Sequence, residues 1–169
     1  MNMRYFVTVV LFIASMTGAK AKNIISVDYT EESELVSVIA HLAKVPGYIW
    51  PEEQAGVIDY FHQVDSTFAP YSNHPIMAFV ADSLVKQGFG YHVPVAMALR
   101  LKLKNGKLHY NTDLEPDFNH YYRGITPQHE KKLIALLEDF YKKAHFHSFF
   151  KKNQPLYNAC KQTMQQQLV

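Results

Sequence analysis

The side chains of this 169-residue sequence that are best suited to bind metals or transfer protons are its nine histidines. A zinc peptidase needs the pattern His-Glu-x-x-His on a helix, where two histidines one turn apart hold the metal and the glutamate is the general base. The one His-Glu pair is His129-Glu130, and Leu133 occupies the place of the second ligand. His145 and His147 are two residues apart, so they would project from different sides of a helix. These spacings predict no metal-binding residue and no catalytic residue.

Other chemical motifs are missing or incomplete. The sequence has no Gly-x-Ser-x-Gly turn, and the glycines at 88 and 90 are too few for a phosphate-binding loop. Acidic residues cluster at 31–34 and 52–53, where we expect the first turns of helices. A third cluster, at 113–117, is a candidate cation site, but it lacks the glycine and final glutamate of an EF-hand loop. Cys160 is at helical spacing from Leu156 and Met164, so we expect a buried, inert thiol.

Two groups of aromatic and imidazole side chains remain as candidate ligand-binding residues. Asn73-His74-Pro75 predicts the start of a helix that Asn73 or His74 caps, and the alternative is an exposed imidazole beside Tyr71 that contacts a ligand. The second group lies in an irregular segment, where rings can stack on sugars or peptides or simply hold the loop onto the helices. Its members are Tyr110, Phe118, His120, Tyr121 and Tyr122.

Hydrophobic residues at helical spacing predict the elements that would position these groups. Thr30 is a predicted N-cap, with His41 on the flank of the helix that follows. Thr126 and Pro127 open the clearest helix, with Glu130 facing solvent. The predicted helices cover 31–45, 52–68 and 75–87, followed by one from about 94, one from 127, a short one with Phe146, Phe149 and Phe150, and a last one from Pro155.

The fold class that follows is mostly α, with a single domain of about six or seven helices. Asn105-Gly106 is a turn signal, and it allows a small β-hairpin that pairs 101–104 with 107–110 inside an otherwise irregular stretch. The last predicted helix runs into 165–169 without a residue that ends a helix. That feature suggests a truncated chain, and a frayed terminus is the alternative.

The first 21 residues have the pattern of a secretory signal peptide. Arg4 gives a positive start, residues 5–16 form an apolar stretch, and Ala19-Lys20-Ala21 provides a cleavage pattern that would leave Lys22 as the first mature residue. The apolar stretch is shorter than the roughly 20 residues that cross a bilayer. We therefore predict a signal peptide over 1–21 and an exported helical domain over 22–169, periplasmic or extracellular, with no stable membrane span.

The charge of the predicted mature chain is balanced. Cleavage removes Arg4 and Lys20 and no acid, so 15 of the 17 basic residues remain against 15 acidic ones. A neutral chain lacks the electrostatic footprint of a nucleic-acid-binding protein, so no nucleic-acid partner is expected. A single cysteine also excludes an internal disulfide framework.

A series of short segments supports a resemblance to a known family. In order they are Ser33-Glu34-Leu35, Tyr48, Asp59-Tyr60-Phe61, His74-Pro75, Gly88-Phe89-Gly90-Tyr91, Asp139-Phe140-Tyr141 and Pro155-Leu156-Tyr157. Their order and spacing, over about residues 26 to 164, resemble the N-terminal region of the domain of unknown function 4932 family of exported bacterial proteins. Longer members continue to a His-Glu-x-x-His helix that looks like a zinc peptidase signature. The resemblance implies a helical front part without that helix, with zinc only if the missing part is supplied.

Three functions are compatible with these observations. The first is a non-catalytic binding or scaffold module of a metallopeptidase-like family, with a peptide or protein partner. The second is a glycan- or peptide-binding module that uses the aromatic segment 110–122. The third is a hydrolase whose histidine and carboxylate residues come together only in the folded chain.

Overall fold

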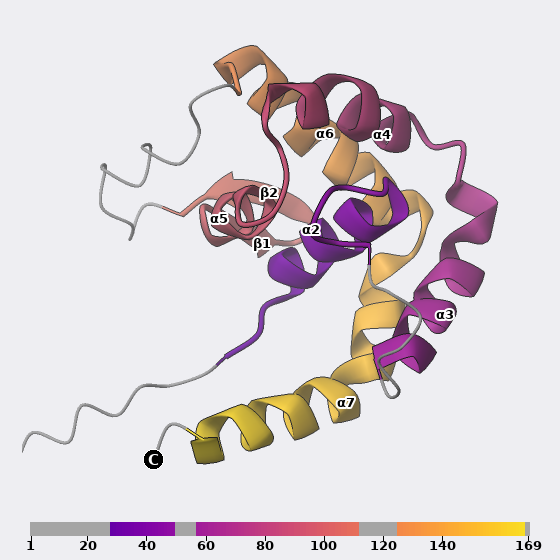
Figure 1. Cartoon of the computed structure of the whole chain (residues 1–169), viewed down its shortest axis with the longest axis vertical. Helices are drawn as coiled ribbons and strands as arrows, with labels where there is room; N and C mark the ends of the chain where they lie inside the picture. Colours follow the sequence, from indigo (N-terminus) through magenta and orange to yellow (C-terminus); the bar gives the residue numbers. More distant parts are fainter. Residues whose placement is uncertain (1–27, 50–56, 112–124, 168–169) are drawn as a thin grey trace, which may run out of the picture.

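The computed structural model describes residues 28–49, 57–111 and 125–167 (Figure 1). Within these ranges the chain is mostly helical and has one two-stranded antiparallel sheet, which confirms the predicted fold class. The predicted signal peptide and its cleavage residues lie outside the described ranges. The elements are α2 (Glu31–Leu42), α3 (Val57–Phe68), α4 (Pro75–Ala78), α5 (Val93–Leu99), β1 (Leu101–Lys104), β2 (Lys107–Tyr110), α6 (Pro127–Lys143) and α7 (Phe146–Gln167).

Two threonines cap the helices that the sequence predicts they cap. The hydroxyl of Thr30 accepts the backbone N–H of Ser33 at 3.2 Å, and that of Thr126 accepts the N–H of His129 at 3.2 Å. Each bond satisfies an amide that the first turn of a helix leaves free. Helix α2 ends earlier than predicted, because the chain leaves it through Lys44, whose φ is 57°.

Helix α2 lies at the centre of the molecule (Figure 1). It packs against α4, α5, α6, α7 and β1, and its residues Leu35 and Ile39 are buried. An aromatic cluster links the remaining helices, since Phe68 of α3 lies 5.5 Å from Phe140 of α6 and 5.8 Å from Phe146 of α7, measured between ring centroids. Each fully buried phenylalanine stabilises the fold by about 1.5–3 kcal/mol.

The predicted β-hairpin forms with the expected register. Leu101 pairs with Tyr110 and Lys104 with Lys107. Asn105 and Gly106 make the turn with φ of 52° and 71°, which is the left-handed conformation that a two-residue hairpin turn requires. The hairpin therefore follows directly from the Asn-Gly signal.

The third predicted helix is less regular than expected. It begins as α4 at Pro75, continues as a π-helical segment (η2, Phe79–Leu84) and narrows to a 3₁₀ turn (η3, Val85–Gln87). Gly88 ends it with φ of 90°, as predicted for a glycine after the last turn of a helix. Phe79, Val80 and Leu84 of the π segment are buried, so the irregular backbone still presents an apolar face to the core.

The predicted helix start at Pro155 is wrong, because α7 runs without a break from Phe146 to Gln167 (Figure 1). Proline has no backbone N–H, so the hydrogen bond to the carbonyl of Lys151, four residues earlier, is lost. Lys151 is exposed, so water can donate the missing hydrogen bond to that carbonyl. The buried stripe that Phe146 starts continues through Asn153 and Tyr157, on both sides of the proline. Packing of this stripe overrides the local signal.

The same stripe corrects the prediction for the free thiol. The buried stripe ends at Tyr157: Cys160 and Met164 follow it at helical spacing on nearly the same face, but this last part of α7 lies beyond the core, and Cys160 is exposed. Leu156 and Met164 are 40% and 54% exposed, so the predicted apolar face is not part of the core. In the described part of the chain, no helix combines the length and apolar character needed to cross a bilayer.

Candidate functional site

A cavity of about 180 Å³ lies between α2 and α3. Its size suits one compact chemical group rather than a large ligand. Most of the wall is apolar or aromatic, and one ionisable carboxyl group faces it. The lining residues are Glu34, Ser37 and Val38 of α2, Tyr48 of the following loop, and Tyr60 and Phe61 of α3.

The positions of these residues follow from the helices that carry them. Glu34 and Val38 are one helical turn apart on α2, so the carboxylate shares a face with a buried apolar residue. On α3, Val64 and Phe68 are buried in the core, and Tyr60 lies one turn before Val64 on the same face. The two faces meet at the cavity.

Glu34 is held by two tyrosines from distant parts of the chain. The Tyr60 hydroxyl donates a hydrogen bond to its carboxylate, and the Tyr157 hydroxyl lies 3.0 Å from that of Tyr60. Burial raises the pKa of Glu34, and the hydrogen bond from Tyr60, with the Tyr157 hydroxyl behind it, opposes that rise. Burial also raises the pKa of Tyr60 and Tyr157, and the nearby carboxylate adds to both increases. Both phenols are therefore neutral donors at physiological pH.

Aromatic rings form the corner beside this carboxylate. The centroids of Tyr60 and Phe61 are 5.8 Å apart and the rings are inclined at 63°. The Tyr157 ring closes the other side of Tyr60, at 6.1 Å and 77°. The Tyr48 hydroxyl bonds to the backbone of Val95, which fixes the opposite wall. The lining rings of Tyr60 and Phe61 therefore give the cavity aromatic walls in two different planes.

A buried histidine supports the walls of the cavity. His41 lies in the last turn of α2 and is 6% exposed, and its ring lies 4.4 Å from that of Phe61. Its Nδ1 is 3.1 Å from the carbonyl oxygen of Tyr48, and its Nε2 is 3.0 Å from Asp65 Oδ1. Both ring nitrogens are thus occupied, and the imidazole joins the Tyr48 loop and α3 to α2.

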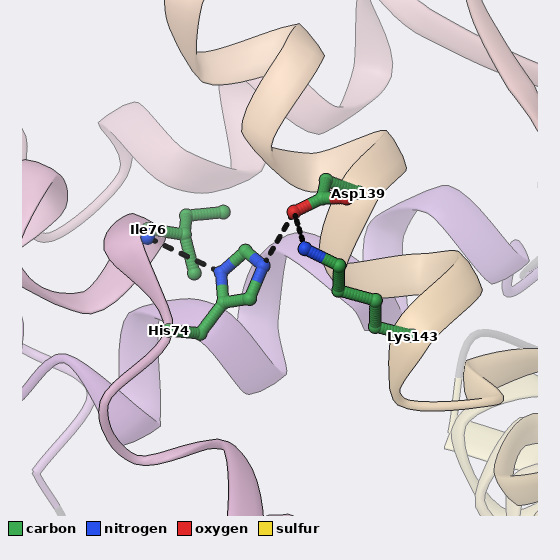
Figure 2. A network of polar contacts seen from close by, with 4 residues as sticks. All are labelled: His74, Ile76, Asp139 and Lys143. Carbon is green, nitrogen blue, oxygen red and sulfur yellow. Dashed lines mark hydrogen bonds and ion pairs between the residues drawn. The ribbon is translucent and has the colours of Figure 1, made fainter.

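His74, a predicted ligand-binding residue, is a helix cap (Figure 2). Its Nδ1 accepts the backbone N–H of Ile76 at 3.2 Å, and its Nε2 is 3.0 Å from Asp139 Oδ2. Lys143 donates to the same oxygen at 2.9 Å, and the hydrogen bonds from Lys143 and His74 lower the pKa of Asp139. His74 is 8% exposed, so the alternative of an exposed imidazole is wrong, because the ring packs edge-on against Phe140 between α4 and α6.

The other predicted ligand-binding residues fall in separate places. Tyr71 packs edge-on against Phe140, at 6.0 Å, and so lies beside His74 as expected, as part of the core. Tyr110 is at the end of β2 and is 51% exposed, with the Arg100 guanidinium 5.8 Å from its ring centroid. His120, Tyr121 and Tyr122 lie outside the described residues, as does the candidate cation site at 113–117.

Two of the first-turn acids of α2 do more than stabilise the helix end. Glu34 lines the cavity, and Glu31 accepts from the Tyr141 hydroxyl at 3.0 Å and lies 2.9 Å from His147 Nδ1. Burial and the Glu31 carboxylate raise the pKa of Tyr141 to about 12. Sequence reasoning missed the role of Glu34, and the available signal was its one-turn spacing from the core residue Val38.

A third first-turn acid, Glu130 of α6, also departs from expectation. Its side chain is 16% exposed and lies 3.3 Å from Arg100 Nη1, so it does not face solvent as predicted.

A second cavity, of about 250 Å³, lies between α3 and α7 and is lined by Gln63, Thr67, Ala144, His145, Ser148, Phe149 and Lys152. Its charged side chain, Lys152, is exposed, so it lacks the buried charge that marks the first cavity.

In the residues that the structure describes, no group of three or more histidine, cysteine, aspartate or glutamate side chains could hold a metal ion. The cavity beside Glu34 has one carboxylate and three aromatic side chains among its described lining residues. Comparison of the chain with known protein families, with curated proteins and with solved structures finds no match.

Proposed function

We propose that the protein is a non-catalytic binding module whose ligand occupies the cavity between α2 and α3. The observation that carries this proposal is the carboxylate of Glu34 on the wall of an apolar cavity. Placing a carboxylate away from water is costly unless it is paired and hydrogen-bonded. Tyr60, with Tyr157 behind it, bonds to this carboxylate, and a ligand in the cavity would meet the same group.

The surroundings of the carboxylate favour binding over turnover. A general acid or base needs a pKa near the working pH, whereas burial and the Glu34 charge move the pKa of Tyr60 far above that range. The nearest imidazole, His41, has both nitrogens engaged by Tyr48 and Asp65. These groups hold the walls of the site in place, which is what a binding pocket requires.

A fragment screen by ligand-observed NMR, carried out on the full chain, tests this proposal. We expect fragments with Kd of about 1 mM to bind the wild type. Ser37→Trp should abolish this binding, because the indole fills the cavity from a lining position. Ser66→Trp, on the exposed side of α3, is the matched control and should bind as the wild type does. Fragments that bind Ser37→Trp equally well, or no fragment binding at all, would contradict the proposal.

We further propose that this module acts outside the cytoplasm, as the front part of an architecture like that of the domain of unknown function 4932 family. The support is the signal-peptide pattern of residues 1–21 and the order of motifs along the chain. The natural ligand would then be an exported peptide, protein or glycan, or a small molecule of that compartment. Expression of the full chain in a bacterium, followed by mass spectrometry of the exported form, should find a protein that begins at Lys22.

One observation favours a second binding surface. The half-exposed Tyr110 ring, with the Arg100 guanidinium beside it, offers the stacking surface that sugars and peptides use. In the sequence, Tyr110 precedes the other residues predicted to bind a ligand, His120, Tyr121 and Tyr122. Glycan and peptide arrays should then show retention by the wild type that is lost in Tyr110→Ala and kept in Ser37→Trp.

A further inference from the structure

We propose that the occupant of the cavity is an organic cation with a methylated ammonium group, held between the Glu34 carboxylate and the faces of the surrounding rings. This inference rests on the proposed binding function and assigns the chemical class of the ligand. It depends on three features of the cavity: its aromatic walls, its single charge, and the shortage of hydrogen-bonding groups around that charge.

The aromatic walls suit a cation. Three of the six lining residues are aromatic, namely Tyr48, Tyr60 and Phe61. Tyr60 and Phe61 meet at 63° with centroids 5.8 Å apart, so a compact ion in their corner would lie against two rings at once. The negative face of an aromatic ring attracts a cation within about 6 Å, and the attraction is strongest where water is excluded.

The charge of the cavity has the matching sign. Among the lining residues that the structure describes, Glu34 is the one that carries a charge, and the described groups that face its carboxylate are the neutral phenols Tyr60 of α3 and Tyr157 of α7. His41 lies on the far side of Phe61 and is paired with Asp65. An anion would be repelled by Glu34, and a cation would relieve the cost of burying its charge, the same burial that raises the pKa of Glu34.

Few groups in the cavity could replace lost water around a small, strongly hydrated ion. A primary ammonium needs three acceptors and a metal ion needs several oxygen ligands. Among the described lining residues, the hydrogen-bonding groups are the Glu34 carboxylate, the Ser37 hydroxyl and the hydroxyls of Tyr48 and Tyr60. Tyr60 is already bonded to Glu34 and Tyr157, and Tyr48 to the backbone of Val95. A methylated ammonium carries its charge on a surface of methyl groups and needs no hydrogen bonds. It therefore fits this combination of one carboxylate and three rings better than the alternatives.

Isothermal titration calorimetry of the full chain tests the inference with three probes of similar size. These are choline, its neutral carbon isostere 3,3-dimethylbutan-1-ol, and ethanolamine. We expect choline to bind at least about tenfold more tightly than the other two. Its affinity should fall as the pH drops through the pKa of Glu34, since protonation removes the carboxylate charge. A peptide with one trimethyllysine, compared with free choline, distinguishes a peptide source from a small-molecule source by which of the two binds more tightly.

A matched pair of variants assigns the effect to the carboxylate. Glu34→Gln keeps the shape of the side chain and should lose choline affinity by about tenfold while keeping any affinity for the isostere. Glu32→Gln removes a first-turn acid that does not line the cavity and should bind choline like the wild type. Circular dichroism of both variants confirms that they are folded.

The outcomes separate this inference from the binding proposal on which it rests. Equal affinity for choline and the isostere would overturn the cation assignment and leave the cavity a binding site. The cation assignment would also be overturned if neither probe bound, although fragments bound the wild type and not Ser37→Trp. An absence of both fragment and probe binding would overturn both proposals.

Discussion

The hydroxyl oxygens of Tyr60 and Tyr157 lie 3.0 Å apart, although 97 positions separate the two residues in the chain. A phenol has one proton, and that of Tyr60 is donated to Glu34. The bond between the tyrosines therefore has Tyr157 as its donor. A directed chain of hydrogen bonds thus runs from α7 through α3 to the carboxylate on α2, and it fixes one side of the cavity.

Tyr60→Phe removes the central link of this chain. Loss of one hydrogen bond to a charged group should lower the free energy of unfolding by about 1.5–3 kcal/mol. The pKa of Glu34 should rise further, because the hydrogen bond from Tyr60 is the main influence that lowers it. Urea denaturation measures the first effect and an NMR titration of the Glu34 carboxyl carbon the second. Tyr157→Phe leaves the Tyr60 donor in place, so a shift as large as that of Tyr60→Phe would show that the order of the chain is wrong.

Glu34→Gln should change how stability depends on pH. The pKa of Glu34 is higher in the folded protein than the usual 4.5, so the folded state binds this proton more tightly than the unfolded chain does. The stability linked to this proton is fully present below the unfolded pKa and is lost as the pH rises through the folded pKa. Glu34→Gln has no carboxyl proton at this position, so its stability has no such dependence on pH. Its stability relative to the wild type should therefore increase between pH 4 and pH 8 in urea denaturation, and a constant difference would argue against burial of the charge.

His74→Ala should destabilise the start of α4. It removes the acceptor for the Ile76 amide and a partner of Asp139, and the loss of a cap with its buried bond corresponds to about 1–3 kcal/mol. His74→Asn supplies a side-chain oxygen that can cap the same amide and should recover roughly half of this loss. The midpoint of urea denaturation measures both. Equal midpoints for the two variants would show that the cap contributes little.

Cys160 should react freely in the folded protein. Its thiol is exposed on α7, so a maleimide should label the native and the urea-unfolded chains at rates within about tenfold of each other. Cys160→Ser is the control and should not be labelled. A native rate slower by several orders of magnitude would mean that α7 buries the face of Leu156 and Cys160 after all.

The parts of the fold that the sequence predicts well are those with a short-range cause. Thr30 and Thr126 cap their helices through bonds to amides three residues away. Asn105-Gly106 determines the hairpin, because few other residue pairs adopt the two left-handed conformations of its turn. In each case the signal and the structure it predicts lie within a few residues.

The errors have a long-range cause. Pro155 is a strong local stop signal, but the burial of Phe146 and Tyr157 on either side of it keeps α7 continuous. The role of Glu34 depends on tyrosines from α3 and α7, and nothing near Glu34 in the sequence indicates them. The sequence feature that indicates a site is a glutamate one helical turn before the core residue Val38, which places a carboxylate on the apolar face of the helix.

The support that Tyr157 of α7 gives to Tyr60 and Glu34 also determines when the site is complete. A growing chain emerges from the ribosome with Glu34 first, then Tyr60, and Tyr157 only much later. Closing so long a loop costs entropy that only the docking of α7 returns. The hydrogen bond between Tyr60 and Tyr157 is therefore a marker of completed folding, and a nascent or partly refolded chain has no finished pocket in which to capture a ligand too early.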